Sequence, residues 1–469
     1  MTESVDVVFV HSNLESWVLG RRHEPLGLGI LQAQLEERGL STKLVDSYLH
    51  DMSSDETVAE VRKLNPQLVG ISAVDDSLQH AFQVSQSLKQ KEFLVGMGGY
   101  GPTFQSKRCL EQGKVDFVLR GEGEAVVPYL FPDLIKNGRK SLENSKSTVY
   151  LNGREIIEKP LAEVVHDLDS IPFPLRRDMQ PKDYEVGGVE RALISTSRGC
   201  QWGEIQGCNF CDIWKLPGKT YRRRSPENIN LELKMLQDEH GISVFSDASP
   251  DFLGCNERYG NIPWIKKFFQ LNSKLDDFNY YFETRADALL SALPVLNEFL
   301  DSIYAIDVGI EHFSNSVLKR FQKGTTKQIN MDAIKALQVF EQKKLQNKSE
   351  EYRPVFYDFF TIDVDKETTL EEFKEHFETI KGLSIAHLWT LQKMVYHPII
   401  SSEQQREIWT DATPTAQVLD YFISNLRSID GTLGAVTYET TDLNERGQKL
   451  IDIFDELILS MEQQEEAVP

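Results

Sequence analysis

The amino-acid sequence predicts an α/β protein that begins with a doubly wound parallel sheet and continues into a full or partial (β/α) barrel, with a small, mostly helical C-terminal region. Two observations support this fold class. Short apolar strands alternate with helical segments through most of the chain, and glycines or polar residues follow the ends of the strands. The 469 residues exceed one ordinary domain. We expect a sheet domain at 1–140, a linker at 141–184, a barrel at 185–400 and a helical region at 401–469 with a disordered tail.

The first 140 residues contain five short apolar segments that we expect to be strands. The helical segment at 26–38 ends at Gly39, a typical C-cap, and the one at 54–64 ends at Asn65-Pro66. Helices of this length between strands imply parallel pairing with right-handed crossovers. The expected strands are 5–10, 42–46, 68–72, 93–97 and 117–120, and the expected helices are 26–38, 54–64, 78–89 and 106–112.

Glycines and small polar residues gather where these strands end. A glycine allows the backbone to approach a ligand closely, although each one alone also suits a tight turn. Four such loops on one edge of a doubly wound sheet favour a binding site, because ligands bind there. The candidate ligand contacts are Leu26, Gly27, Ser72, Gly98, Gly99, Thr103, Gly121 and Glu122.

The rest of the chain also alternates. Asn137-Gly138 and Asn152-Gly153 predict hairpin turns, and Ile171–Pro174 predicts an extended linker. We expect a loop at 342–353, an amphipathic helix at 450–460 and disorder from 462. The expected strands are 193–196, 244–247, 280–285, 305–311 and 355–362, and the helices between them are 228–240, 263–275, 288–299, 314–321 and 330–342.

The composition limits the partners. A formal net charge of −21 argues against an extended nucleic-acid surface, which would need clustered Lys and Arg. No apolar run approaches the roughly 20 residues that span a bilayer, and the N-terminus lacks the basic start of a signal peptide. We therefore expect a cytoplasmic protein that acts on a small molecule, with no nucleic-acid or membrane partner.

Three of the five cysteines, Cys200, Cys208 and Cys211, lie within twelve residues. Three thiolates can hold three irons of a four-iron cluster and leave the fourth iron open, as a reactive cluster needs. The alternative is a closed zinc site completed by a distant histidine. Of the other two, Cys109 is expected to be buried in a helix, and Cys255 is either a packing residue or a catalytic candidate on the substrate side.

Eight motifs follow one another along the chain, namely Glu24–Leu31, Val69–Ala73, Gly98-Gly99, Val115–Glu124, Thr196–Cys200, Cys208–Cys211, Asp307–Glu311 and Gln322–Thr326. Taken in order, they resemble the radical S-adenosylmethionine (SAM) superfamily, in the branch with an N-terminal cobalamin (B12)-binding domain. One departure stands out. The usual loop is C-x3-C-x2-C, whereas the first spacing here is seven. Because the final C-x2-C is intact, the insertion is free to bulge outward while the three thiolates still converge, and we expect the cluster to survive.

The resemblance implies a [4Fe-4S] cluster on the three cysteines that binds SAM. With an electron from a donor such as flavodoxin or ferredoxin, the bound SAM would yield a 5′-deoxyadenosyl radical. The implied SAM contacts are Phe210 near adenine, Asp247 and Ser249 near the methionine amine, Arg285 near its carboxylate, and Glu283 and Glu311 at strand ends. Strand-end residues also cap barrel helices, and Phe210 also suits loop packing. His312 is a candidate proton donor, although a lone histidine is commonly structural.

The resemblance also implies cobalamin at the strand ends of the first domain. The motif D-x-H-x-x-G, which supplies a histidine ligand to cobalt, is absent around His11. Some relatives bind cobalamin without a protein ligand, and others keep the domain without the corrin. Three functions therefore stay open: cobalamin-dependent methyl transfer to an unreactive carbon; a cobalamin-independent radical rearrangement, sulfur insertion, cyclisation or other group transfer; and a non-catalytic metal or corrin sensor.

Overall fold

The structure is a computed structural model, and it forms two compact units that each contain a parallel sheet. The first unit comprises 1–17, 21–199 and 215–242, and the second comprises 18–20, 200–214 and 243–469. The residues that the structure describes are 5–14, 23–89, 93–184, 189–216, 219–255, 257–346, 356–385, 412–413, 415–419 and 443–466.

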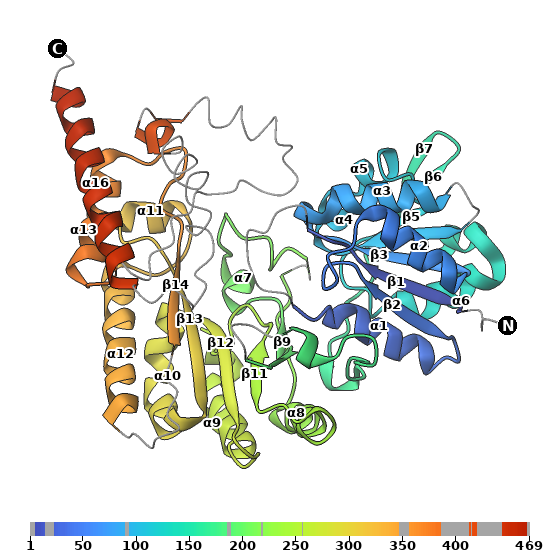
Figure 1. Cartoon of the computed structure of the whole chain (residues 1–469), viewed down its shortest axis with the longest axis horizontal. Helices are drawn as coiled ribbons and strands as arrows, with labels where there is room; N and C mark the ends of the chain where they lie inside the picture. Colours follow the sequence, from blue (N-terminus) through green and yellow to red (C-terminus); the bar gives the residue numbers. More distant parts are fainter. Residues whose placement is uncertain are drawn as a thin grey trace. The chain divides into compact units, whose positions relative to one another are not determined.

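The first unit contains a seven-stranded sheet with the order β2-β1-β3-β4-β5-β6-β7 (Figure 1). The five strands from β2 to β5 are parallel, and β6 and β7 are antiparallel. The doubly wound prediction is confirmed, and the chain reverses direction across the sheet between β1 and β3, where such folds bind ligands. The strands are β1 Val7–His11, β2 Thr42–Asp46, β3 Leu68–Ser72, β4 Leu94–Gly98, β5 Phe117–Leu119, β6 Thr148–Asn152 and β7 Glu155–Glu158.

Helices cover both faces of this sheet, as the alternation of buried strand residues requires. Val8 and Val10 pack with α2 (Ser54–Leu64), α3 (Leu78–Lys89) and α5 (Ser106–Glu111). Val7 and Phe9 point to the other face and pack with α1 (Leu26–Glu36) and α6 (Val127–Asn137). Figure 1 shows α2 and α3 on one side of the strands and α1 on the other. Both faces are therefore buried, so the strand ends are left for a ligand.

Two features of the first unit differ from the expectations. Helix α6 was not predicted, because Pro128 and Pro132 interrupt its pattern; Pro128 lies in the first turn, where a proline costs no hydrogen bond, and Pro132 lies inside the helix. The hairpin predicted at Asn137-Gly138 is wrong. Gly138, with φ of +64°, instead ends α6, because a glycine with positive φ suits a helix end as well as a turn.

The turn at Asn152-Gly153 is confirmed, since it joins β6 to β7. This hairpin extends the first sheet, and it lies in the segment that the sequence analysis describes as a linker. The remaining elements of the first unit are α4 Tyr100–Phe104, β8 Ala192–Ile194, β9 Ser197–Arg198, β10 Arg222–Arg223 and α8 Pro226–His240. Ser225 caps α8 by accepting from the Asn228 N–H at 3.1 Å, as its position before a proline predicts.

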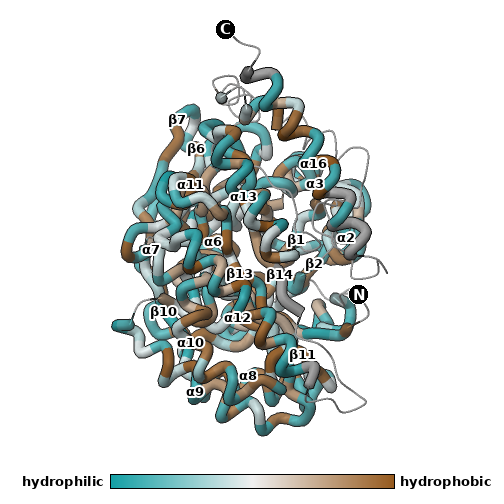
Figure 2. The backbone as a smooth tube through the Cα atoms, turned by 90° about the vertical axis from the view of Figure 1, so that its left-hand side faces the viewer, coloured by the Kyte–Doolittle hydropathy of each residue, from teal (hydrophilic) through white to brown (hydrophobic). Residues whose placement is uncertain are grey.

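The second unit repeats strand and helix, and its strands β14, β13, β12 and β11 lie side by side and parallel. This parallel β/α arrangement is the partial form of the predicted barrel. Figure 2 shows hydrophobic and hydrophilic stretches alternating along α10 and α12, as expected for helices with one buried face. The elements are α7 Gln201–Ile205, β11 Val244–Asp247, α9 Asn261–Asn272, β12 Asn279–Arg285, α10 Ala286–Glu298, β13 Ile303–Glu311, α11 Asn315–Arg320, α12 Lys327–Gln346, β14 Phe356–Thr361, α13 Leu370–Gly382 and α16 Leu443–Glu466.

Two helices extend past their expected ends. Helix α12 continues to Gln346, into the expected loop, and α16 continues to Glu466, into the expected disordered tail. The error has one cause: an exposed helical turn needs no apolar residue, so a polar run does not distinguish it from a loop. Most of 401–442 lies outside the described residues. Within the described part of the chain, no helix has the length and apolarity that a bilayer span requires.

Candidate functional site

A cavity of about 440 Å³ lies at the C-terminal ends of the strands in the first unit. Ligand pockets commonly have volumes of roughly 300–1,000 Å³. The cavity brings together seven of the eight predicted ligand contacts, which are Leu26, Gly27, Ser72, Gly98, Gly99, Gly121 and Glu122. The strand pairing explains why: His11 pairs with Ser72, and Ser72 pairs with Gly98, so the three strands end at one level.

The eighth predicted contact, Thr103, joins two of the loops that line the cavity. Its Oγ1 donates to the Gly99 carbonyl at 2.7 Å and accepts from the Gly121 N–H at 3.1 Å. Gly99 has φ of +105°, and a Cβ there would lie 2.5 Å from the Ala73 carbonyl oxygen. Thr103 therefore supports the cavity by fixing its loops, and position 99 requires glycine.

The carboxylates that line the cavity already form ion pairs with arginines of the same unit. The Glu122 carboxylate accepts from both terminal nitrogens of Arg222, and one of these contacts is 2.8 Å. Glu124 accepts from Arg198 at 2.9 Å. The cavity therefore presents neutralised charges, apolar side chains and exposed backbone, which suits a large and mostly neutral ligand.

A histidine and a buried acid lie at the edge of the cavity. His11 Nδ1 is 2.9 Å from Asp46 Oδ1, and Tyr184 donates its hydroxyl to the other Asp46 oxygen. Burial favours the neutral acid, but the bonds from His11 and Tyr184 outweigh it and hold the pKa of Asp46 below its usual value. Asp46 and Tyr184 were not predicted, because their contact joins residues 138 positions apart in the sequence.

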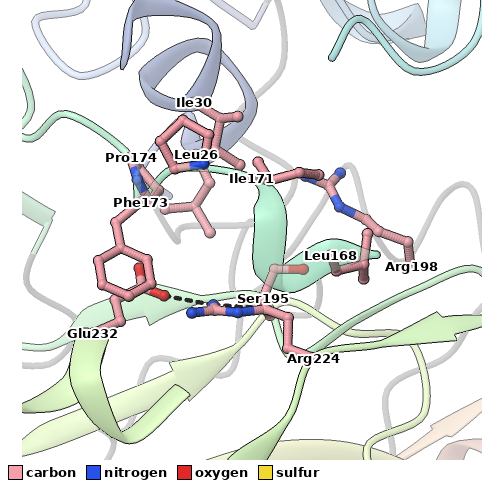
Figure 3. A pocket seen from close by; sticks show the side chains of 11 residues that line it. Leu26, Ile30, Leu168, Ile171, Phe173, Pro174, Ser195, Arg198, Arg224 and Glu232 are labelled. Atoms are coloured by element: carbon pink, nitrogen blue, oxygen red, sulfur yellow. Dashed lines mark hydrogen bonds and ion pairs between the residues drawn. The ribbon is translucent and has the colours of Figure 1, made fainter. Parts of the chain in front are cut away.

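A second cavity in the first unit has a volume of only about 30 Å³ (Figure 3). Arg224 Nη1 lies 2.5 Å from Glu232, which also accepts from Arg176 at 3.1 Å. The space admits little more than a water molecule. Its buried ion pairs hold α8 in place, and we assign no ligand to it.

The three clustered cysteines lie together in the second unit. Burial raises the pKa of Cys200, raises that of Cys208 to about 11 and raises that of Cys211 to about 12, and the three thiols influence one another electrostatically. Binding iron must therefore release protons. Three soft thiol donors on one loop suit an iron–sulfur cluster, and their role as its ligands stays a prediction. Among the described residues, no three His, Cys, Asp or Glu side chains, these cysteines included, are grouped to hold a single metal ion, so the geometry favours neither the cluster nor the zinc alternative.

The cysteine loop turns outward only in part: Ile205 is 55% exposed, whereas Gly203 and Gly207 are buried. Its first residues form the short helix α7, Gln201–Ile205. The Trp214 side chain fills the space beside Gly203 and Gly207, where an added Cβ would lie 2.2 Å from Trp214 Cβ and 2.6 Å from the ring, respectively. Trp214 Nε1 donates to the Cys208 carbonyl at 3.1 Å. Two glycines and a tryptophan therefore make the longer loop compact.

Three of the predicted SAM contacts end strands, namely Asp247 in β11, Arg285 in β12 and Glu311 in β13, whereas Phe210 lies in the cysteine loop. Phe210 packs edge-on against Phe321 with the ring centres 5.5 Å apart, in line with the loop-packing alternative. Asp247 and Ser249 are buried in the turn after β11, where Asp247 Oδ1 accepts from the Ser249 N–H at 2.9 Å. Glu283 lies in β12, and its carbonyl accepts from the Phe252 N–H at 3.0 Å, which ties the β11 loop to β12.

Arg285 and Glu311 belong to one buried charge network. The Arg285 guanidinium donates to both oxygens of Asp287 at 3.0 Å and to the Lys323 carbonyl at 2.9 Å. Lys323 Nζ donates to Glu311 Oε1 at 2.8 Å. Glu311 has φ of +62°, which is uncommon for a residue with a side chain and marks a strained strand end.

The structure also places the remaining candidates, His312 and Cys255, and the buried Cys109. His312 is fully buried, stacks on His376 with the ring centres 4.1 Å apart and accepts from the Ser314 N–H, and burial holds its pKa well below 6.5. These contacts favour the structural interpretation. Burial raises the pKa of Cys255 to about 12, and Asp251 and Cys200 influence it. Cys109 is fully buried in α5.

The B12 binding domain family matches residues 18–131 of this chain. The chain is 27% identical over 338 residues to an uncharacterized methyltransferase of Pyrococcus horikoshii, covering 69% of this chain and 68% of that protein. It is 27% identical to the anaerobic magnesium-protoporphyrin IX monomethyl ester cyclase of Cereibacter sphaeroides, covering 71% of this chain and 54% of the cyclase. Residues 18–131 therefore contain a B12-binding domain, and about 70% of the chain is similar to a methyltransferase and to a cyclase.

A solved structure shows the same fold. The cobalamin-dependent SAM radical enzyme OxsB with aqua-cobalamin bound aligns over 90% of this chain and 57% of OxsB, with a TM-score of 0.67 and 19% identity. The chain thus spans little more than half of OxsB and of the cyclase. The B12-binding domain and the radical SAM fold expected from the sequence are both confirmed.

Three residues of the radical SAM unit were missed by sequence reasoning. Lys323 lies inside the motif Gln322–Thr326, so its signal was present, but the motif did not reveal its ion pair. Asp251 accepts from Thr284 Oγ1 at 3.0 Å, and its Oδ2 is buried with no partner among the described residues. Trp202 stacks over Arg285, with 4.7 Å between the guanidinium carbon and the ring centre. Loop residues such as these cannot be placed without the folded loop.

Proposed function

We propose that this chain is a cobalamin-dependent radical SAM methyltransferase that modifies an unreactive carbon of a small molecule. The observation that carries the proposal is the open cavity at the strand ends of the B12-binding domain. A domain kept only as a scaffold would have no need for the glycines that keep this space open, because larger side chains would add buried apolar area. The methyltransferase relative adds support for methyl transfer.

The residues of the second unit have separate tasks in this proposal. Cys200, Cys208 and Cys211 would hold the cluster, which when reduced supplies the electron that cleaves SAM, while cobalamin supplies the methyl group. Burial, opposed by Arg285, raises the pKa of Asp251, and the unpaired Oδ2 of this residue suits the methionine ammonium of SAM as an acceptor. Arg285 and Lys323 supply positive charge for the methionine carboxylate.

The Asp251 side chain is well placed for this task. The neighbouring Phe252 packs against Phe268 and Phe282, with ring centres 5.1 Å and 4.8 Å away, and its N–H donates to the Glu283 carbonyl. The aromatic core thus anchors the loop after β11 so that Asp251 meets Thr284. A fixed acceptor gains more from binding an ammonium than a mobile one, because less side-chain entropy is lost.

The experiment is anaerobic reconstitution with iron, sulfide and hydroxocobalamin, followed by incubation with SAM and a one-electron donor such as reduced flavodoxin or ferredoxin. We expect 5′-deoxyadenosine to form, corrin absorbance to remain with the protein through gel filtration, and the methyl group of labelled SAM to appear on cobalamin. Formation of 5′-deoxyadenosine without bound corrin would instead support the cobalamin-independent radical enzyme. A reconstituted protein that binds neither a cluster nor a corrin would contradict the proposal.

The cyclase relative gives one observation in favour of a second candidate. The alignment to the magnesium-protoporphyrin cyclase covers slightly more of this chain than the alignment to the methyltransferase, at equal identity. A radical cyclisation would consume SAM without transferring its methyl group. Tracing the labelled methyl group in the same incubation therefore separates the two reactions.

A further inference from the structure

The longer cysteine loop contacts a second loop of the same unit through Trp202. Trp202 Nε1 donates to the Gln322 carbonyl at 2.9 Å, and its ring occupies the space beside Gly324, where a Cβ would lie 2.3 Å away. The same ring lies over the Arg285 guanidinium. A single side chain, two residues after Cys200, therefore contacts both the cation of β12 and the segment 322–324.

The segment 322–324 is shaped to direct Lys323 inward. Gln322 has φ of +55° and Gly324 has φ of +78°, so left-handed residues flank the lysine on both sides. The Lys323 N–H donates to the Leu318 carbonyl at 3.1 Å, and its ammonium reaches Glu311. Gly309 leaves room for this ion pair, since a Cβ there would lie 2.9 Å from both Lys323 Nζ and Glu311 Oε1.

Arg285 and Lys323 are linked and lie near a cluster ligand. The guanidinium donates to the Lys323 carbonyl, so the two cations are held by one loop. Burial raises the pKa of the Cys208 thiol; Lys323 and Arg285 are the two cations that oppose this rise, and Glu311, the partner of Lys323, adds to it. Both cations are at least nine-tenths buried, so solvent screens their charges only weakly.

We propose that the lengthened cysteine loop holds Arg285 and Lys323 in place through Trp202, an arrangement that we call the clamp. The two buried cations then lie beside the cluster ligands and raise the reduction potential of the cluster. Positive charge near an iron–sulfur cluster favours its reduced state, which carries one more electron. Trp202 is a positioning residue that acts through the two cations. The inference rests on the proposed function, because it concerns the cluster that the three cysteines would hold.

The test is EPR-monitored redox titration of the reconstituted enzyme without SAM. Lys323→Met and Trp202→Leu should shift the cluster to a lower potential, by about tenfold in the ratio of oxidised to reduced cluster at a fixed potential, which is about 59 mV for one electron. Trp202→Phe, which keeps a ring but loses the N–H donor, should give a smaller shift. Trp264→Leu is the matched control, because Trp264 stacks on Phe268 in the aromatic core and should leave the potential unchanged.

Hydrogen exchange provides a second readout that needs no cluster. In the cluster-free protein, Trp202→Leu should speed exchange of the Lys323 amide, while Trp264→Leu should not. The proposal would be overturned if Lys323→Met and Trp202→Leu both held the wild-type amount of cluster and both kept the wild-type reduction potential. If Trp202→Leu cannot hold a cluster, Lys323→Met and Trp202→Phe decide the matter. A wild-type protein that binds no cluster would contradict the proposed function itself, and unchanged exchange in Trp202→Leu would then refute the clamp separately.

Discussion

The cavity of the B12-binding domain is lined mostly by glycines, apolar side chains and paired charges, whereas the cysteine site of the radical SAM unit contains buried thiols and cations that lie close together. The cavity exists before its ligand arrives, because backbone turns with positive φ at Gly99 and Gly121 leave the space open. The cysteine site instead holds protonated thiols until metal displaces their protons. The first site should therefore be sensitive to side-chain volume and the second to charge and pH.

The largest expected effect is at the cysteine site. Replacing Cys208 with Ala should remove the cluster and reduce 5′-deoxyadenosine formation to background, because two thiolates cannot hold a four-iron cluster open to SAM. Iron analysis and product chromatography measure this loss. Corrin binding in the first unit should stay at the wild-type level, and Cys109→Ala serves as a control that leaves the cluster ligands intact. Full product formation by Cys208→Ala would refute the ligand assignment.

The second largest effect tests the cavity by volume. Gly27 lines the cavity, and a Cβ added there would meet no atom within 4 Å. Gly27→Trp should therefore occupy the ligand space and weaken cobalamin binding by about 100-fold, which equals about 2.7 kcal/mol. Equilibrium titration followed by corrin absorbance measures this change, and iron content should not change.

Gly27→Ala is the matched control for that variant. It adds one methyl group within α1, so it should bind cobalamin as the wild type does. It should also raise the free energy of unfolding by about 0.5–1 kcal/mol, since alanine favours a helix over glycine. Equal binding by the Trp and Ala variants would show that the ligand does not use this cavity.

The pH dependence sharpens the contrast between the sites. The thiols of Cys208 and Cys211 have folded-state pKa values of about 11 and about 12, above the usual value, so their contribution to stability is complete below the unfolded pKa and is lost as the pH rises toward the folded values. Denaturant titration of the cluster-free protein should show a free energy of unfolding lower by about 1 kcal/mol per thiol at pH 9.5 than at pH 7. Replacing Cys200, Cys208 and Cys211 with Ser should reduce this drop, and an undiminished drop would place its origin elsewhere.

The sequence predicted the cavity residues better than the residues around the cysteines, because strand ends follow a regular period and loop contacts do not. Strand ends in a parallel sheet fall at one level, so Ser72 and Gly98 could be placed together from periodicity alone. The network around Lys323 depends on how the β11 loop, the cysteine loop and the segment 322–324 fold against one another, and no period encodes this. The helix across Pro132 was missed because a proline inside a helix reads as a break, although the packing of Phe131 and Leu134 on the sheet stabilises it.

The smallest expected effect concerns the one predicted contact that does not line the cavity. Thr103→Val keeps the shape of the side chain but removes the hydroxyl that joins Gly99 and Gly121, so the two loops lose about 1 kcal/mol of mutual support. Cobalamin binding, measured by the same titration, should weaken by about fivefold, because the ligand must then order the loops itself. Thr103→Ser retains the hydroxyl and should bind as the wild type does. If Thr103→Ser is as weak as Thr103→Val, the methyl group and not the hydrogen bonds supports the cavity, and the view that backbone geometry shapes this site would fail at this loop.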